Sequence, residues 1–545
     1  NSEECPFHRW SADGTNFVLT CVPLRGHLTP LLYVAQELAE RGHNVLLAVP
    51  SKALKWVPAE MLHPAVHVHE LEGPLDPPAE EAAQGLLPAV AKWLRQHFLL
   101  SEEFQQPYDP FVDALHLMAR CGHRPDMLFV DFVSHFGFDA ADAFPVPAVA
   151  SVPMVGAYQH NSLLVPSPSS GFRLEMSVFE RVISFMMAHV KPLLHIPMAV
   201  QMNRRRAALG LGSLSSPQEY LDSRLQVCFT TVGFEYAQLE PPSVFHVGPA
   251  QTSALAPPET DGDHFLKPGP AAFTVVPPLR DDVVAWLDEQ QASERRVVYV
   301  SAGSTKILTA RVVAIIDGAL KALLEHRQGS PPVKGSRFCS VSGEVAVLYN
   351  MDRERFFPDG HWSDSGEHEG KVRFAKEVEQ PRVLRHKAVR VFLSHCGLNS
   401  VNEAMMAGVP IVGVPHQFDQ HDNAARIADQ GMGLAIPANY VREGVLTEAL
   451  VRVLDTGAYK ENARRMRTLS MTQRGSTSAA EILEQAIFAG SSPRLLNYAQ
   501  QHPLVSQLLP CLVLLLMAWA MYRLGRVAYR RGRSVAPANV RKKRD

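Results

Sequence analysis

Runs of apolar residues alternate with amphipathic stretches over the first half of the chain. The apolar run FVLTCVP begins at Phe17, and a turn at Gly26 separates it from an amphipathic stretch over residues 31–41 and a second apolar run, VLLAVP. This order predicts a strand, a helix and a second strand, which is the building unit of a parallel sheet. Further strands are expected at residues 127–130 and 148–152. The pattern therefore predicts an α/β lobe over residues 16–248, preceded by an N-terminal tail over residues 1–15.

A second alternating set follows a segment rich in Pro, Gly and Asp, residues 249–290, which is expected to be a linker. This set predicts a helix over residues 310–326 and strands at VVYVSAG, VAVLYN, VRF, VRVFLSH and VPIVGVP. Residues 351–371 interrupt it and are expected to form an exposed, irregular insertion. The sequence thus predicts two doubly wound, Rossmann-like lobes, the second over residues 291–490, that face each other across a ligand-binding cleft.

The C-terminal region has a different character. Residues 503–522 are 20 residues without a charge, followed by a tail over 523–545 that holds nine Lys or Arg and one acidic residue, Asp545. The length predicts a transmembrane helix, and the alternative is a buried C-terminal helix. Basic residues on its C-terminal side predict a cytosolic tail and a lumenal body, and the final Lys542-Lys543-Arg544-Asp545 matches a dilysine signal for the endoplasmic reticulum. No Asn-x-Ser/Thr glycosylation site occurs, which is unexpected for a lumenal body.

Composition narrows the class of partner. The chain of 545 residues has a net charge of -2, and its basic residues are concentrated in the tail, so the body is mildly acidic. A concentrated basic face is needed to bind phosphate backbones, so nucleic acid is not expected as a partner. The seven cysteines are scattered singly, which indicates neither a disulfide framework nor a structural metal site.

The richest segment for chemistry is VFLSHCGLNSVNEAMMAGVPIVGVPHQFDQHDNA, residues 391–424. A strand is expected to end at His395, and a helix is expected to open near Asn399. The N-H groups of a helix start favour an anion such as a diphosphate, and Ser400 adds a further donor. Glu403 is placed to accept sugar hydroxyls, and the following loop adds His416, Asp419, Gln420 and Asn423, whose types suit hydroxyl recognition.

This segment resembles the signature of the UDP-glycosyltransferase superfamily, whose members adopt the two-lobed GT-B fold. The resemblance rests on Gln380, Leu384, His386, Phe392, His395, Gly397, Asn399, Ser400, Glu403, Asp419 and Gln420, with weaker matches in CFTTVGFE and FHVGP. It implies that His395, Gly397, Asn399 and Ser400 hold the diphosphate, that Glu403 holds the ribose, and that Asp419 and Gln420 hold the transferred sugar. Ser301 and Ser304 resemble a Ser-x-Gly-Ser loop of the family beside the phosphates.

One departure from the family pattern concerns the base. By spacing from Phe392, Glu377 stands where the family has a uracil-stacking tryptophan, and Glu379 stands where it has a proline. Stacking on Phe374, or contacts to the backbone, are the expected substitutes.

A candidate general base lies in the first lobe. His27, in the turn PLRGHLTP, follows the first strand, and Asp131 follows the strand MLFV. A neutral imidazole can take a proton from an acceptor hydroxyl if a carboxylate orients it, and both positions resemble the catalytic pair of the family. His43 also follows a glycine, but Gly42 is expected to cap a helix, so His43 is interpreted as structural.

These features together predict an inverting transferase that moves glucose or glucuronate from a UDP-sugar to a hydroxyl of a small lipophilic acceptor, with no metal or other cofactor. Asp261-Gly262-Asp263 is interpreted as a solvated turn rather than a metal site, because no apolar strand precedes it. The alternatives are a nucleotide-sugar epimerase and a catalytically inactive UDP-sugar-binding receptor or scaffold in the membrane.

Overall fold

The structure is a computed structural model of the chain. It describes residues 5–72, 108–156, 164–251, 280–301, 309–325, 342–489 and 523, apart from the single residues 195, 239, 359, 365, 377 and 438. All the helices and strands below belong to one unit, residues 1–492.

The first lobe is built on a seven-stranded parallel sheet with the strand order β3-β2-β1-β4-β5-β6-β7. Its strands are β1 (Asn16–Thr20), β2 (Asn44–Pro50), β3 (Val66–Leu71), β4 (Met127–Asp131), β5 (Ala148–Val152), β6 (Gln226–Cys228) and β7 (Val244–His246). The helices between them are α1 (Arg25–Glu40), α3 (Tyr108–Arg120), α4 (His135–Ala143), α5 (Val178–Leu194), α6 (Ile196–Ala208) and α7 (Glu219–Asp222).

The second lobe has a six-stranded parallel sheet with the order β10-β9-β8-β11-β12-β13. Its strands are β8 (Arg296–Ser301), β9 (Val345–Asn350), β10 (Val372–Ala375), β11 (Val389–Ser394), β12 (Ile411–Gly413) and β13 (Gly433–Ala435). The helices that accompany it are α8 (Asp281–Ala292), α9 (Ala310–Glu325), α10 (Arg353–Phe356), α11 (Gln380–Arg385), α12 (Leu398–Ala407), α13 (Gln420–Asp429), α14 (Glu443–Asp455) and α15 (Gly457–Met471). The predicted architecture of two doubly wound α/β lobes is confirmed.

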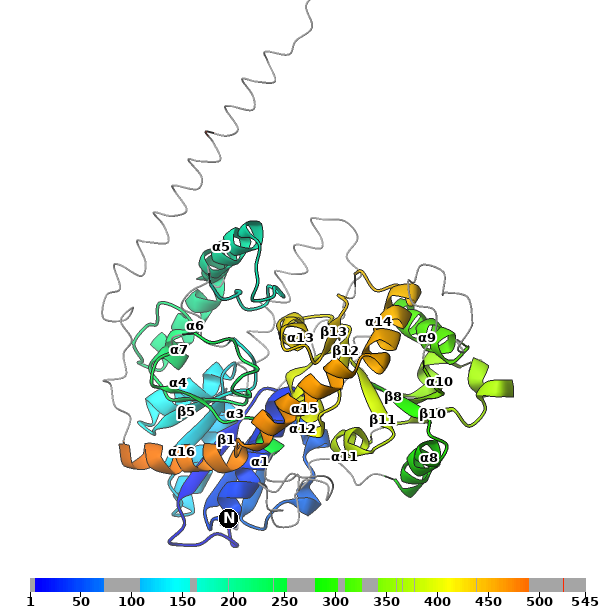
Figure 1. Ribbon diagram of the computed structural model, residues 1–545. Coiled ribbons are helices and arrows are strands. Elements are labelled where there is room, and N and C mark those ends of the chain that lie inside the picture. Colours follow the sequence, from blue (N-terminus) through cyan, green and yellow to red (C-terminus); the bar gives the residue numbers. More distant parts are fainter. Residues whose placement is uncertain are drawn as a thin grey trace, which may run out of the picture. The chain divides into compact units, whose positions relative to one another are not determined.

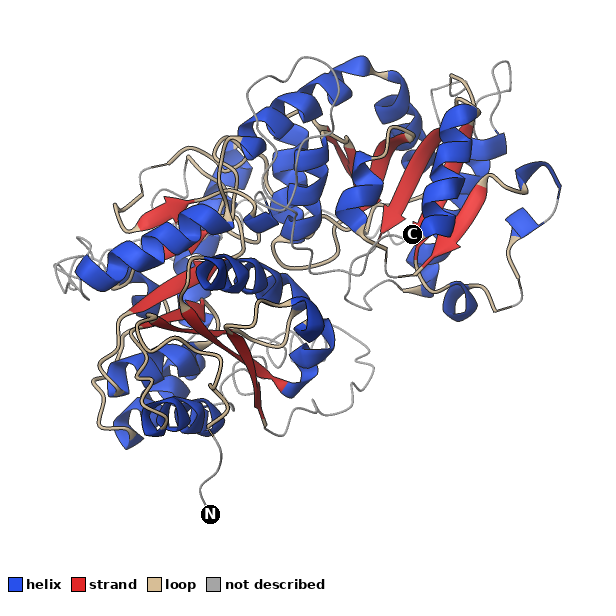
Figure 2. Cartoon of the chain, turned by 90° about the horizontal axis from the view of Figure 1, so that it is seen from below, coloured by secondary structure: helices blue, strands red, loops and turns tan. Residues whose placement is uncertain are grey.

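The central strands are buried on both faces, which explains why they are continuous apolar runs in the sequence. All seven residues of β2 are buried, and so are all five residues of β4. Helices cover both faces of the strands (Figure 2). Each sheet thus separates two hydrophobic cores, and a strand contributes alternate side chains to each of them.

The last described helix, α16 (Ser476–Ala489), returns to the first lobe, where it runs beside α1 (Figure 1). Ala479, Ala480 and Leu483 are fully buried in the same core as the apolar face of α1. On its polar side, Glu484 accepts hydrogen bonds from Arg41 (3.0 Å) and bonds to His43 (2.9 Å). His43 thus has a structural contact in this lobe.

Three elements differ from what the sequence pattern suggests. Helix α1 begins at Arg25 rather than near residue 31, because the helix includes the glycine of the expected turn and continues through Pro30. Helix α8 occupies residues 281–292, inside the predicted linker. The domain boundaries given above otherwise stay predictions.

The third difference is the insertion over 351–371, which is anchored rather than irregular throughout. The carboxylate of Asp317 on α9 accepts hydrogen bonds from Trp362 Nε1 (2.8 Å) and Tyr349 Oη (3.0 Å), and it bonds to His361 Nε2 (2.7 Å). His361 and Ser363 are consequently buried. The sequence pattern alone did not show this, because the anchor is a carboxylate on a distant helix.

No helix within the described ranges is long and apolar enough to cross a bilayer. The predicted transmembrane helix over residues 503–522 lies outside these ranges, so it stays a prediction.

Candidate functional site

The strand order of the first sheet reverses between β1 and β4, and the candidate base lies at that point. From β1 the sheet continues through β2 and β3 on one side, and through β4 and the later strands on the other side. A crevice of this kind, at the carboxyl ends of the strands, is where doubly wound sheets bind ligands. Asp131 is the last residue of β4, and His27 lies in the first turn of α1, which follows β1. The fold therefore brings together two residues that are far apart in the sequence.

His27 and Asp131 form a direct pair. The Nδ1 atom of His27 lies 2.7 Å from Oδ1 of Asp131, and the Asp131 side chain is fully buried while that of His27 is 22% exposed. This contact leaves Nε2 as the ring nitrogen that can exchange a proton with another molecule. The His27 ring also stacks on Phe132, with 5.7 Å between centroids.

The charge of His27 is set by two opposing effects. Burial lowers its pKa, but the hydrogen-bonded carboxylate of Asp131 and the more distant Asp419 together raise the pKa above its ordinary value. An imidazolium at this position is therefore stabilised, as a base that has just accepted a proton requires.

The second sheet reverses its strand order between β8 and β11, and the predicted phosphate-binding residues lie there. Ser301 ends β8, His395 follows β11, and Gly397 is the N-cap residue of α12. The free N-H groups at the start of α12 therefore point to the switch point of this sheet, where an anion is stabilised. Ser304 lies outside the described residues.

His395 is held neutral beside this helix start. Burial and the neighbouring His416 lower its pKa to about 4. Its Nδ1 atom is buried and has no hydrogen-bond partner among the described residues, and the same is true of His416 Nε2. Both imidazoles line one small cavity together with Ser301. Buried polar atoms without partners are costly, so these atoms are suited to a polar ligand.

Glu403 is the centre of a hydrogen-bonded group on α12 and α11. Its Oε2 accepts from Gln380 Nε2 (2.6 Å), and its Oε1 accepts from Gln251 Nε2 (3.1 Å). Gln380 Nε2 also donates to the hydroxyl of Ser400 (3.0 Å), and its Oε1 accepts from Tyr299 Oη (3.1 Å). Burial raises the pKa of Glu403, whereas these amide hydrogen bonds and Arg25 lower it. A carboxylate retains lone pairs for further donors, so this group can accept the hydroxyls of a sugar.

Asp419 and Gln420 lie at the start of α13, the helix that follows β12. Asp419 Oδ2 accepts from Asn423 Nδ2 (2.9 Å), and Gln420 Oε1 accepts from the backbone N-H of His416 (3.0 Å). Burial raises the pKa of Asp419 to about 6, although the Asn423 hydrogen bond opposes this shift. Asp419 and His27 influence each other electrostatically, so residues from the two lobes face a common space.

The two lobes touch where these groups meet. Asn399 Nδ2 donates to the backbone oxygen of Gly26 (3.2 Å), which precedes His27 in the chain. The structure thus brings the base pair of the first lobe next to the helix start of the second. The sequence pattern did not identify Arg25, Gln251 or Tyr299 as neighbours of this site, nor Asn350, whose Nδ2 donates to Tyr299 Oη at 3.0 Å. Gln251 directly follows FHVGPA, but nothing in that run indicates a contact to Glu403.

The Phe374 ring already packs against other side chains. Tyr349 stacks on it at 4.7 Å with an interplanar angle of 7°, and the guanidinium of Arg353 lies over the ring at 5.6 Å. Stacking of uracil on Phe374 stays a prediction. Glu377 lies outside the described residues, as does the Asp261-Gly262-Asp263 run. Within the described ranges, no group of three His, Cys, Asp or Glu side chains could hold a metal ion.

Comparison with known proteins adds to this geometry. Residues 368–488 match the family described as "UDP-glucoronosyl and UDP-glucosyl transferase". This range includes α12, α13 and every predicted donor-binding residue except Ser301 and Ser304. Over these residues the chain is similar to the UDP-glycosyltransferase superfamily.

Two named relatives are similar over different lengths of the chain. The chain is 41% identical over 98 residues to 2-hydroxyacylsphingosine 1-beta-galactosyltransferase of Rattus norvegicus, a match that covers 18% of each chain. It is 24% identical over 402 residues to UDP-glycosyltransferase stmC of Aspergillus ustus, covering 68% of this chain and 66% of that one. The matched region thus covers less than a fifth of the length of the rat relative.

Solved structures share the GT-B fold over most of the chain. The glycotransferase of kitacinnamycin is 17% identical, with a TM-score of 0.57, and the match covers 87% of this chain and 99% of that one. Glycosyltransferase VinC, solved in complex with DTDP, is 16% identical with the same TM-score and covers 87% and 100%. At these identities the likeness shows the fold alone.

Proposed function

We propose that the protein is an inverting glycosyltransferase that moves a hexose, glucose or glucuronate, from a UDP-sugar to a hydroxyl of a small lipophilic acceptor. The observation that carries this proposal is the 2.7 Å pair of His27 and Asp131. It faces, through the contact of Gly26 with Asn399, a helix start suited to a diphosphate. The match of residues 368–488 to the family model supports the same reaction class.

In this reaction, His27 Nε2 takes the proton of the acceptor hydroxyl while Asp131 stabilises the imidazolium that forms. The acceptor oxygen attacks the anomeric carbon, and the bond from that carbon to the diphosphate oxygen breaks in the same step. A single displacement of this kind inverts the anomeric centre. The charge that develops on UDP is met by the N-H groups at the start of α12 and by the neutral His395 as a hydrogen-bond donor. On this proposal no metal or cofactor is needed.

Donor recognition is assigned to the second lobe. Glu403 and Gln380 suit the ribose hydroxyls, because together they offer carboxylate and amide groups 2.6 Å apart. Asp419 and Gln420 suit the hydroxyls of the transferred sugar. The acceptor would bind against the first lobe, in the regions of residues 73–110 and 151–205, where Met, Phe and Leu are abundant. Together with the uncharged run at 503–522, this favours an enzyme held by one span in the endoplasmic reticulum membrane with a lumenal body.

A donor and acceptor screen tests the proposal. Purified protein is incubated with UDP-glucose, UDP-glucuronate or UDP-galactose and a panel of phenols, sterols and a 2-hydroxyacylsphingosine, and glycosides are detected by mass spectrometry. Formation of a glycoside with an inverted anomeric centre is the expected result. Binding of UDP-sugars without any transfer would favour the receptor alternative, and conversion of one UDP-sugar into another without an acceptor would favour the epimerase.

A further inference from the structure

One face of α13 is bound to loops of the first lobe. Asp422, Arg426 and Asp429 are spaced so that they lie on the same side of this helix. Arg426 and Glu235 form an ion pair in which both side chains are more than nine-tenths buried. Asp429 accepts a hydrogen bond from Tyr236 Oη at 2.6 Å. The helix that begins with the predicted sugar-binding residues is therefore held by the first lobe.

The most specific of these contacts involves residues 164–176 of the first lobe, here named the strap. The Asp422 carboxylate, 4% exposed, accepts from the backbone N-H of Ser169 (2.6 Å) and of Gly171 (2.9 Å). Ser169 and Gly171 both have a φ of 66°, so the strap turns tightly around the carboxylate. Backbone N-H groups that converge in this way form an anion-binding concavity.

Further contacts fix the strap at both ends. On the helix side, the N-H of Leu174 donates to Asp429 Oδ2 at 2.8 Å. On the side of its own lobe, the N-H of Ser167 donates to the hydroxyl of Ser184 on α5 at 2.8 Å. A side chain at position 171 would not fit, because a Cβ there would lie 2.9 Å from that of His421. The strap therefore lies directly on the first turn of α13, next to Asp419 and Gln420.

We propose that Asp422 is a positioning residue that locks the strap over the sugar-transfer site and so excludes water as a competing acceptor. This inference rests on the proposed function. Without the lock, water attacks the anomeric carbon, the bond to UDP breaks, and the free sugar and UDP are released. An enclosed site prevents such side reactions.

The ratio of UDP-sugar hydrolysis to glycoside formation measures this role, and it does not depend on the fraction of folded protein. Asp422→Ala removes the carboxylate that holds the strap, and Gly171→Ala pushes the strap away without altering any polar group. Hydrogen bonds to a charged group are the strong ones, so we expect both variants to raise the ratio by about tenfold or more. The dissociation constant of UDP should change less than about twofold, since neither residue contacts the diphosphate site. Asp422→Asn, which keeps an acceptor oxygen, should give an intermediate ratio.

Gly210→Ala is the matched control. Gly210 lies in the same lobe at a φ of 72°, but a Cβ there would meet nothing within 4 Å. It introduces the same backbone strain without displacing the strap, so the ratio should equal that of the wild type. An unchanged ratio in both Asp422→Ala and Gly171→Ala would overturn the inference.

Amide hydrogen exchange separates this inference from the proposed function. If the wild type neither transfers nor hydrolyses any UDP-sugar, the proposed function fails. Amide hydrogen exchange of the strap still shows whether Asp422 holds the strap in place. With no ligand added, the strap amides should exchange faster in Asp422→Ala than in the wild type, because the bonds to the carboxylate are lost. Equal exchange of the strap amides in the two proteins would contradict the proposal.

Discussion

The imidazole of His27 and the carboxylate of Asp131 are joined by a 2.7 Å hydrogen bond although 104 positions separate them in the chain. Asp131 ends β4 and His27 lies in the first turn of α1, which follows β1, and the first sheet reverses its order between these two strands. The geometry of a doubly wound sheet thus produces the pair without any local motif.

The pair predicts how the transfer rate depends on pH. Only the neutral imidazole accepts a proton, and Asp131 raises the pKa of His27 despite its burial, so kcat/KM should fall as the pH drops through a value above 6.5. Asp131→Asn removes the countercharge and should move this fall to lower pH while reducing the plateau rate. Rate profiles of both proteins between pH 5 and 9 check this, and identical midpoints would show that His27 does not set the profile.

A second prediction concerns the space beside His395. A Cβ added at Gly397 would lie 2.5 Å from His395 Nε2, so Gly397→Ala must displace the ring from the start of α12. We expect the affinity for UDP to fall by about tenfold, or 1.4 kcal/mol, as measured by calorimetry. Gly457→Ala is the control, since a Cβ there would meet nothing within 4 Å. Equal affinities of the two variants would place the diphosphate elsewhere.

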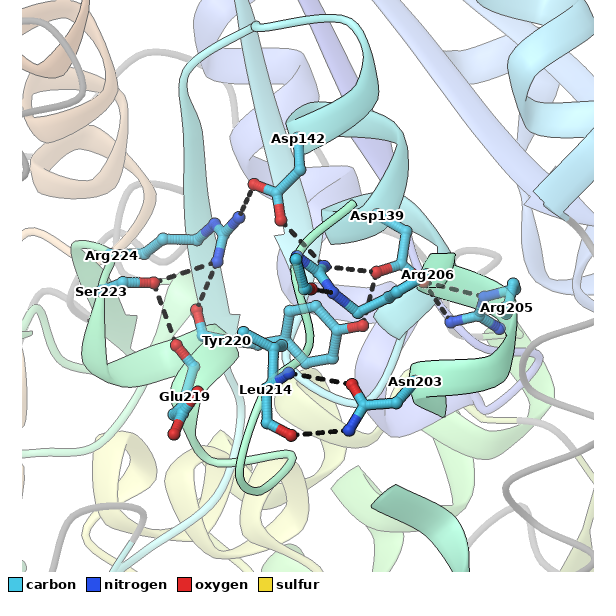
Figure 3. A network of polar contacts seen from close by, with 11 residues as sticks. Asp139, Asp142, Asn203, Arg205, Arg206, Leu214, Glu219, Tyr220, Ser223 and Arg224 are labelled. Atoms are coloured by element: carbon cyan, nitrogen blue, oxygen red, sulfur yellow. Dashed lines mark hydrogen bonds and ion pairs between the residues drawn. The ribbon is translucent and has the colours of Figure 1, made fainter. Parts of the chain in front are cut away.

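A third prediction addresses stability in the first lobe. The fully buried carboxylate of Asp139 accepts hydrogen bonds from Arg205, Arg206 and Tyr220, which hold α6 and α7 against α4 (Figure 3). Asp139→Ala leaves the buried guanidinium of Arg206 and the partly buried one of Arg205 without this partner, and should cost about 3–5 kcal/mol of unfolding free energy.

Thermal unfolding measures this loss against an exposed ion pair. Lys321 and Glu325 lie 4.0 Å apart and are both about half exposed, so Glu325→Gln should cost about 0–1 kcal/mol. Similar melting temperatures for the two variants would mean that the Asp139 network contributes little.

Much of the fold could be predicted from the sequence because buried parallel strands are apolar runs. β5 and β9 lie where the pattern places them, and α9 begins at the expected residue. β3 was missed, since its sequence VHVHEL carries two histidines and a glutamate at a partly exposed edge of the sheet.

The parts that could not be predicted depend on distant contacts. The apolar face of α16 looks the same whichever core it joins, so its return to the first lobe is invisible in the sequence. Gln251 is a similar case, because only the folded chain brings it to Glu403. The candidate site itself was predictable chiefly through the resemblance of residues 391–424 to the family signature.

A fourth prediction concerns topology, which the uncharged run and basic tail suggest. With the body in the lumen, protease added to sealed microsomes should trim only the C-terminal tail, because the bilayer shields the rest. Immunoblotting with antibodies against the tail and the body distinguishes the outcomes. Digestion of the body in intact vesicles would place it in the cytosol.

The fifth prediction separates catalysis from donor binding. His27→Ala removes the proposed base from the first lobe and leaves the donor-binding residues of the second lobe in place. His43→Ala is the matched control, because His43 bonds to Glu484 and packs against Phe17 away from the site. We expect it to affect stability at most.

The measurement that tests the central claim most directly compares His27→Ala with the wild type in two quantities, the turnover and the dissociation constant for the UDP-sugar. Turnover should fall by about 10²-fold or more, the usual contribution of a positioned general base, while the dissociation constant stays within about twofold of the wild type. Near-normal turnover of the folded variant would contradict the assignment of His27 as the base. Loss of UDP-sugar binding would contradict the division of roles between the two lobes.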